Sequence, residues 1–167
     1  MVYLFLFIGF FTRLLPHAPN VTPIVAISLF GGTYLSKKTG LLVPLAIMVM
    51  TDLVLGLHEV VWFTWGSVAL ISLLGFWIRR LATTRRIASG AIISSTLFFL
   101  ITNVGVWMTA NWYSHDLTGL IDCFYMALPF YRNQLLGDAL YVTGFFGAYH
   151  VILGSMRRRQ EANQAIS

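Results

Sequence analysis

The hydrophobic positions of the chain group into six apolar stretches, which short polar segments separate. A helix needs about 20 apolar residues to cross the hydrocarbon core of a bilayer. The first two stretches are shorter than a full crossing, so their helices would tilt, thin the bilayer or merge at the segment that joins them. We therefore predict an all-α integral membrane protein, a compact bundle of six transmembrane helices at residues 2–15, 23–36, 41–57, 60–78, 87–110 and 134–156.

A different pattern occupies residues 117–131, a segment too short and too charged to cross a membrane. Its apolar residues recur at helical spacing, with Asp122 and Cys123 off the apolar face. This pattern predicts an extra amphipathic helix on the outer side, in the interface or over the end of the bundle. The predicted apolar face consists of Leu117, Leu120, Ile121, Phe124, Tyr125 and Leu128.

The segment between the first two stretches reads RLLPHAPNVTP at residues 13–23. Each of its three prolines fixes φ, lacks a backbone donor and pushes the preceding residue out of the α region. We expect a stiff, non-helical elbow, with Pro23 in the first turn of the second helix and Thr22 or Asn20 as its cap. A rigid polar elbow beside a membrane core indicates a binding site or, alternatively, a tight turn with an interfacial arginine.

Composition places the chain in a membrane. Hydrophobic residues make up 57% of the 167 positions and charged residues only 10%, and the mean hydropathy is +0.76. Soluble domains contain about 25% charged residues. The length suits one transmembrane domain over residues 1–160 with a cytoplasmic tail at 161–167. The first eleven residues lack a basic region and a small-residue cleavage site, which predicts a retained helix rather than a signal peptide.

The basic residues set the predicted orientation. With six crossings, nine of the eleven Lys and Arg residues fall on the face that holds both termini, and Arg13 and Arg132 fall on the other. Basic loops stay in the cytoplasm. We therefore expect a multi-pass protein of a prokaryotic cytoplasmic (inner) membrane with both termini cytoplasmic. The pI near 9.7 comes from these short basic segments and does not indicate nucleic-acid binding.

Several polar side chains lie inside the apolar stretches, where an ionisable group needs a partner or a water-filled cavity. Asp52 lies in the outer part of the third stretch, Asn103 in the outer half of the fifth, and Asp138 one turn into the sixth. Arg13 and Arg132 lie at a similar depth, so we expect these groups to meet. Pairing of either arginine with either aspartate would fix helix register as a buried ion pair or line an outward-facing pocket with aromatic walls.

The sequence offers little for catalysis. It contains no metalloprotease, nucleophile-elbow or phosphate-loop motif. A metal site of His17, His58 and His115 is conceivable, although their spacing does not require one, and the single cysteine, Cys123, excludes an intramolecular disulfide. We therefore expect no enzymatic activity, no cofactor and no resident metal.

Three of the predicted helices carry small residues four positions apart, a spacing that allows close backbone contact in membranes. Packing within the bundle is one use of this spacing, and docking to a partner membrane protein is the other. The pairs are Ser28 with Gly32, Ala91 with Ser95, and Gly144 with Ala148.

Seven stretches carry a resemblance to known proteins: RLLPHAPNVTPI at 13–24, LFGG at 29–32, Pro44, TDLVLGLH at 51–58, TNVGVW at 102–107, ALPFYRN at 127–133 and GD at 137–138. With them the chain resembles an uncharacterised family of small bacterial membrane proteins, a domain of unknown function. The resemblance covers nearly the whole chain. It implies no activity, because none is assigned to that family.

A more distant resemblance rests on a proline-initiated second helix ending in GGTYL at 31–35, a short basic turn, and a third helix ending in Asp52 and Gly56. These features are similar to substrate-binding (S) components of energy-coupling-factor vitamin transporters. The resemblance implies a vitamin or metal held near the outer face, under the loop between the first two helices. It also implies reorientation of the bundle by a partner ATPase, although the first stretch lacks the Ala-x-x-x-Ala pattern that S components use for docking.

We therefore predict a membrane substrate-capture component for uptake of a vitamin-like small molecule or metal. Its expected partners are that substrate, the lipid bilayer and a transmembrane coupling subunit with ATPases, and not nucleic acid. The alternative is a non-transporting membrane scaffold or assembly subunit, in which the same residues form a closed structural network. The predicted substrate-binding residues are Arg13, His17, Asn20, Asp52, Asn103, Trp107, Arg132, Asn133 and Asp138.

Overall fold

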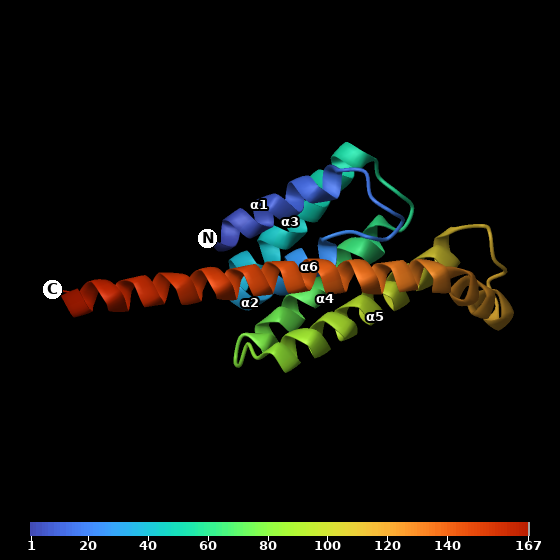
Figure 1. Ribbon diagram of the computed structural model, residues 1–167. Helices are drawn as coiled ribbons and strands as arrows, with labels where there is room; N and C mark the ends of the chain where they lie inside the picture. The colour runs from blue at the N-terminus through green and yellow to red at the C-terminus, as the bar shows by residue number, and fades with distance from the viewer. Residues whose placement is uncertain (167) are drawn as a thin grey trace.

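The computed structural model describes residues 1–166, and every regular element in them is a helix. The chain folds back and forth along one direction, and the C-terminal helix extends beyond the others (Figure 1). The all-helical fold predicted from the sequence is thus confirmed for the described residues. The helices are α1 Val2–Leu14, α2 Ile24–Tyr34, α3 Lys37–Leu55, α4 Val61–Ile78, α5 Thr84–Thr109 and α6 Leu117–Ile166.

Four of the helices in the described chain, α3 to α6, are long and apolar enough to cross a membrane. The other two, α1 and α2, are apolar but contain only 13 and 11 residues. At 1.5 Å per residue they reach roughly 20 and 16 Å, less than the ~30 Å of a hydrocarbon core. The length and composition of the helices therefore agree with a membrane protein, and α1 and α2 are joined by the elbow at residues 15–23.

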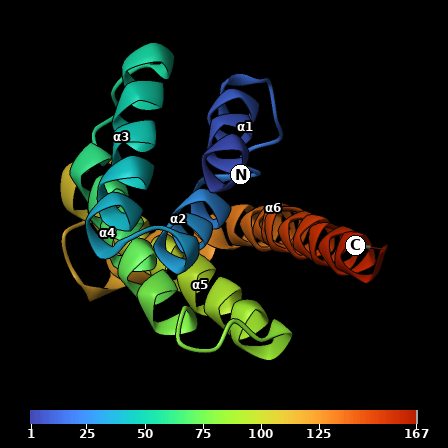
Figure 2. The ribbon, with the colours of Figure 1, turned by 90° about the vertical axis from the view of Figure 1, so that its left-hand side faces the viewer.

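α2 lies at the centre of the bundle and contacts all five other helices (Figure 2). Residues 24–33 are all buried, as expected for a helix that is apolar on every side. Glycines allow neighbouring backbones to approach it. A Cβ added at Gly32 would lie 2.2 Å from the carbonyl oxygen of Ser72 and 3.0 Å from the Cα of Gly75, both on α4. The small residues of α2 are therefore used for packing within the bundle.

Arg79, the residue directly after α4, holds the C-terminal end of α2. Arg79 donates from Nη2 to the carbonyl oxygen of Gly32 at 2.9 Å and from Nε to that of Thr33 at 3.2 Å. The last carbonyls of a helix lack partners within the helix, and a cation there also opposes the negative end of the helix dipole. Arg79 therefore fixes the end of α2 to α4.

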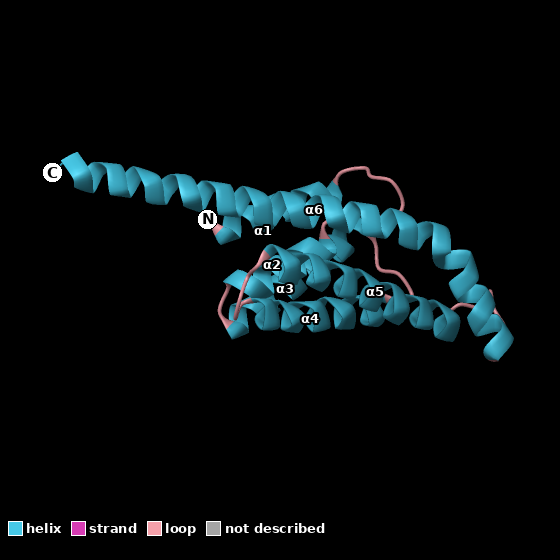
Figure 3. Ribbon diagram, turned by 60° about the horizontal axis from the view of Figure 1, so that its bottom comes forward, coloured by secondary structure: helices cyan, strands magenta, loops and turns pink. Residues whose placement is uncertain are grey.

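The last helix differs from its prediction. Residues 117–131 and the sixth apolar stretch form one helix, α6, of 50 residues, and it curves in its first third, which contains Pro129 (Figure 3). Proline bends a helix without ending it when its surroundings compensate for the lost bond. A separate interfacial helix is therefore absent from the described residues. The predicted tail boundary at 160 also falls inside α6, and Ser167 lies outside the described residues.

The face of α6 that packs on the bundle in its first part is not the apolar face predicted from the sequence. Gly119, Cys123 and Ala127 are buried, whereas Leu117 and Tyr125 of the predicted stripe are exposed. Small side chains let α6 approach α5, and the Cys123 thiol donates to the carbonyl oxygen of Asn103 at 3.5 Å. The expectation that Cys123 points away from the packed face was therefore wrong.

The two ends of the bundle have different chemistry. The connections 15–23, 56–60 and 110–116 lie at one end, which we call the elbow end, and the N-terminus lies at the other (Figure 1). We call this other end the basic end, because it carries nine of the eleven Lys and Arg residues. They are Lys37, Lys38, Arg79, Arg80, Arg85, Arg86, Arg157, Arg158 and Arg159.

Candidate functional site

An ion pair joins α1 to α3 at the elbow end. Arg13, in the last turn of α1, donates from Nη2 to Oδ1 of Asp52 at 2.7 Å. Its Nη1 donates to the carbonyl oxygen of Met48 at 3.3 Å and to the hydroxyl of Thr51. Arg13 is 8% and Asp52 is 1% exposed, so both charges are removed from solvent and each requires the other. This is one of the pairings that the sequence allowed.

The second oxygen of Asp52 is also occupied. Trp65 on α4 donates its indole N–H to Oδ2 at 2.8 Å, and Nε2 of His58 lies 4.0 Å from the same oxygen. His58 belongs to the connection between α3 and α4. Asp52 therefore holds three helices together through Arg13 and Trp65, with both oxygens used inside the protein.

A second polar cluster joins α5 to α6. The hydroxyl of Ser95 donates to Oδ2 of Asp138 at 2.6 Å, and Nε2 of Gln134 donates to the carbonyl oxygen of Ser95 at 2.8 Å. All three residues are at least 95% buried. Among the described residues, no Lys, Arg or His lies within ion-pair distance of Asp138. This carboxyl group therefore differs from Asp52, because no cation accompanies it.

A cavity of about 300 Å³ lies between the two clusters. Each of the six helices, the elbow and the connection 56–60 contribute to its wall. The wall is mixed, as in most small-molecule sites: valine, isoleucine, methionine and phenylalanine side chains surround a few convergent polar groups. The polar side chains other than threonine are Arg13, Asn20, His58, Asn103, Gln134 and Asp138.

The elbow places polar groups over this cavity. Asn20 has φ of 62°, a left-handed conformation that asparagine tolerates better than most residues. The Val21 N–H donates to the carbonyl oxygen of Ala18 at 3.0 Å and closes the turn. Val21 also packs on α6, where a Cβ added at Gly137 would lie 3.0 Å from the Val21 Cα. The elbow is therefore held directly beside Asp138.

The start of α2 supplies further donors. Residue Pro23 precedes the helix, and no side chain caps it. The predicted cap by Thr22 or Asn20 was therefore wrong, since both side chains line the cavity instead. Ile24 and Val25 also line the cavity, so the free N–H groups of the first turn, with the positive end of the helix dipole, lie at its wall.

The nine predicted site residues separate into three groups. Four of them line the cavity, and Asp52 lies behind Arg13 without lining it. The other four do not line the cavity. The exposed His17 ring has Nδ1 3.1 Å from the carbonyl oxygen of Ala18, and Trp107 donates its indole N–H to the carbonyl oxygen of Ser114 at 3.0 Å. The four that line the cavity are Arg13, Asn20, Asn103 and Asp138.

The remaining two predicted residues, Arg132 and Asn133, lie on faces of α6 that point away from the cavity. Successive residues on a helix point about 100° apart, and α6 directs Gln134 and Asp138, four residues apart, into the cavity. Arg132 is exposed and Asn133 half-buried, and neither lines the cavity. Both nevertheless lie within two residues of Gln134, which does line the cavity.

Comparison with known proteins decides the family. The model of a family of unknown function, DUF6580, matches residues 1–162. The chain belongs to this family. No curated protein and no solved structure matches the chain.

Three residues of this DUF6580 protein that matter to the clusters were not predicted as site residues. The sequence indicates Ser95 only as a small packing residue and Gln134 only as the start of the sixth stretch, and it assigns no role to Trp65. Gln134 had a usable signal, because it lies four residues before Asp138 and so on the same face of α6. Ser95 and Trp65 had none, since their partners lie on other helices.

The conceivable histidine metal site has no support in this DUF6580 member. Among the described residues, no group of three or more His, Cys, Asp or Glu side chains is placed to hold a metal ion. Of the three histidines, only His58 lines the cavity. His115 stacks edge-on against Trp107, with ring centroids 6.0 Å apart.

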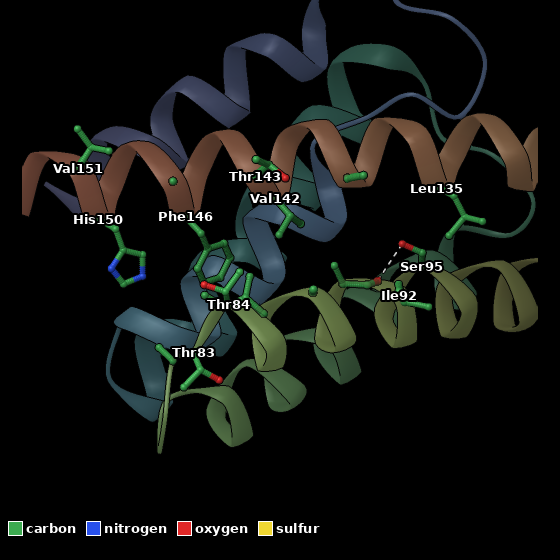
Figure 4. Close-up of a pocket in the computed structure, with 16 residues that line it drawn as sticks. Thr83, Thr84, Ile92, Ser95, Leu135, Val142, Thr143, Phe146, His150 and Val151 are labelled. Carbon is green, nitrogen blue, oxygen red and sulfur yellow. Dashed lines mark hydrogen bonds between the residues drawn. The ribbon is translucent and has the colours of Figure 1, made fainter.

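A second hollow, of about 900 Å³, lies between α5 and α6 and opens toward the basic end. Figure 4 shows the side chains of Val142, Phe146 and His150 on α6 pointing toward α5 across it. Its wall is mainly apolar. Ser95 lines this groove and bonds to Asp138, which lines the cavity at the elbow end. The Ser95–Asp138 contact therefore separates the two hollows.

Proposed function

We propose that this protein is a membrane substrate-capture component, which binds a small molecule in the cavity at the elbow end for uptake. One observation carries the proposal: a cavity of about 300 Å³ into which each of the six helices, the elbow and the connection 56–60 place side chains. Small-molecule sites have this make-up, with apolar walls and a few convergent polar groups. A bundle without a ligand would gain stability by filling the same space with apolar side chains.

The proposed arrangement in the membrane has all six helices embedded in a prokaryotic cytoplasmic (inner) membrane. Nine basic residues at one end and two elsewhere support cytoplasmic termini. The elbow end then faces outward, and the cavity opens to the outside. A polar compound could enter it without crossing the hydrocarbon core.

In this proposal the residues have distinct tasks. Arg13 presents its guanidinium to the ligand while Asp52 holds it in place. Asn103 donates from Nδ2 to the carbonyl oxygen of Phe99 at 2.7 Å, which leaves its side-chain oxygen to accept from a ligand. Asn20 closes the cavity from the elbow. Asp52, predicted as a ligand group, is thus proposed to be a positioning residue.

Release of the ligand to the cytoplasm requires the cavity to change access. By analogy with S components, a transmembrane coupling subunit with ATPases would reorient the bundle, and a vitamin-like molecule or a metal ion would be its cargo. The fit of the mixed cavity wall favours the organic molecule. A solitary protein would instead release the ligand by its own conformational change.

The second candidate function is a non-transporting scaffold or assembly subunit. The observation that favours it is the saturation of the Arg13–Asp52–Trp65 network, in which each charged group has its partner inside the protein. Such networks fix helix register without binding anything. The cavity beside the network is what distinguishes capture from this alternative.

Native mass spectrometry of the protein, extracted gently in detergent, tests the proposal. We expect a small molecule or ion bound at one per chain, and its loss in Asn103→Leu, which fills the cavity. Arg132→Gln, a change at an exposed α6 residue outside the cavity, should retain it. Lipid as the sole bound species in the wild-type protein and in both variants would refute capture and favour the scaffold.

A further inference from the structure

The feature that carries a further inference is the carboxyl group of Asp138. It is 2% exposed and lines the cavity at the elbow end. Within the described residues, the carboxyl group is hydrogen-bonded to the Ser95 hydroxyl, 2.6 Å from Oδ2, and to the Gln134 side chain, and no cation lies within ion-pair distance. An ionised carboxylate that is buried without a counter-charge is costly. A cation bound beside it would stabilise the ionised form, and the described residues supply none.

The other charges at the cavity do not supply that partner. The guanidinium of Arg13 lines the cavity but is paired with Asp52 at 2.7 Å behind it, which offsets much of its charge. His58 is 4.0 Å from the same aspartate on its other oxygen. The N-terminus of α2 contributes about half a positive elementary charge. Among the described residues that line the cavity, Asp138 is therefore the one acidic group, and it has no cation in ion-pair contact.

We infer that the ligand is a small organic cation, such as a protonated amine or a quaternary ammonium compound, whose positive charge pairs with Asp138. This inference deepens the proposed capture function and rests on it. Phe98 and Phe130 line the same cavity, and aromatic rings attract cations through their faces. The free N–H groups of the first turn of α2 suit a hydrogen-bond acceptor elsewhere on the same molecule. The volume of about 300 Å³ limits the ligand to a small compound.

The charge preference can be measured without knowing the natural ligand. Thr102 on α5 lines the cavity, and Thr102→Cys places a thiol there, in a Cys123→Ala background that removes the native thiol. The reaction rates of this thiol with a cationic trimethylammonium and an anionic sulfonate methanethiosulfonate reagent are compared. Thr109→Cys, at the exposed end of α5 outside the cavity, gives the intrinsic ratio of the two rates.

The expected ratio of cationic to anionic rate is at least about tenfold higher at Thr102→Cys than at Thr109→Cys, because one nearby charge in a poorly solvated cavity acts on the two reagents in opposite directions. Adding Asp138→Asn should bring the ratio back to that of Thr109→Cys, whereas Asp138→Glu should retain it. Retention in Asp138→Glu shows that the charge, rather than the fold, sets the ratio.

A protection experiment completes the test with three probes of similar shape: benzylammonium, benzyl alcohol and benzoate. Benzylammonium should slow modification of Thr102→Cys, and the neutral and anionic probes should not. Modification without charge preference, or protection by benzoate, would overturn the cationic ligand and leave capture standing. A Thr102→Cys thiol that reacts with neither reagent would show a closed cavity and overturn capture itself. Protection by sodium ions alone would replace the organic cation with a metal ion and overturn the inference.

Discussion

The ion pair between Arg13 and Asp52 gives the sharpest prediction for the energetics of this bundle. Asp52→Asn keeps the shape of the side chain and one acceptor oxygen for the Trp65 indole, but it removes the negative charge. The guanidinium of Arg13, 8% exposed, then stays in the protein without a counter-charge. Although Arg13 lines the cavity, the described residues place no other carboxylate within ion-pair distance to replace the aspartate.

The expected cost follows from the burial of both partners. Removing one member of a buried ion pair typically destabilises a protein by about 3–5 kcal/mol. Solvent screening does not reduce this figure here, because the two side chains are only 9% and 2% exposed. The equilibrium between folded and unfolded protein should therefore shift by roughly two to four powers of ten.

The free energy of unfolding in mixed micelles, followed by tryptophan fluorescence, measures this cost. The double variant Arg13→Met with Asp52→Asn should recover most of the loss, because no unpaired charge remains. The hydroxyl of Thr51 keeps a partner in that variant, the carbonyl oxygen of Ile47 at 2.8 Å. We expect a coupling energy of about 2 kcal/mol or more between the two positions.

Asp122→Asn is the matched control, since Asp122 is an exposed carboxylate of α6. It should change the free energy of unfolding by less than about 0.5 kcal/mol. Equal losses in Asp52→Asn and Asp122→Asn, or additive effects of the Arg13 and Asp52 changes, would show that the ion pair does not stabilise the bundle. The same measurement tests the reassigned role of Asp52, because a ligand group that holds nothing in place would not be coupled to Arg13.

Three further predictions concern the packing and the helix ends. Gly32→Ala should destabilise the protein by about 1–3 kcal/mol because its Cβ meets the α4 backbone, whereas Gly144→Ala, with open space around it, should be neutral or up to about 1 kcal/mol stabilising in the same unfolding assay. Arg79→Met should lower the free energy of unfolding by about 1.5–3 kcal/mol, because it removes two hydrogen bonds from a charged group. Arg80→Met, at the next residue, which is exposed, should lower it by less than about 0.5 kcal/mol. Equal effects of the two changes would contradict the assigned role of Arg79. Hydrogen bonds from the Gly119 N–H at 2.7 Å, and then from the Ser114 hydroxyl at 2.8 Å, hold the pKa of Asp116 below its usual value. The ionised carboxylate therefore stabilises the first turn of α6 fully above the unfolded pKa near 3.9, and this stabilisation is lost as the pH falls through the folded pKa. Hydrogen exchange of that turn should accelerate over this pH range in the wild-type protein and not in Asp116→Asn.

The sequence predicted the helices well because each has its own apolar run, and it predicted the depth of the polar groups because each interrupts such a run. It could not predict which groups meet. Arg13 bonds to residues 35 to 39 positions away, and only the packing of α1 on α3 selects Asp52 over Asp138. The continuous α6 was missed for a local reason. A change from an amphipathic to an apolar sequence pattern shows that the surroundings of the helix change, from partly solvated to fully apolar. A helix can pass through such a change without ending.

The two aspartates show why residue type and depth cannot separate a structural group from a binding group. Both lie inside apolar stretches near the elbow end, and both are at least 98% buried. Asp52 has a guanidinium on one oxygen and an indole N–H on the other, so a ligand could reach it only by displacing a partner. Asp138 has only neutral hydrogen-bond partners among the described residues, Ser95 and Gln134, and faces a cavity. An ionisable group in a membrane is costly in either case. At Asp52 the hydrogen bonds and the ion pair within the chain offset the cost of burial. At Asp138 they do not, so a ligand would stabilise the protein most at Asp138.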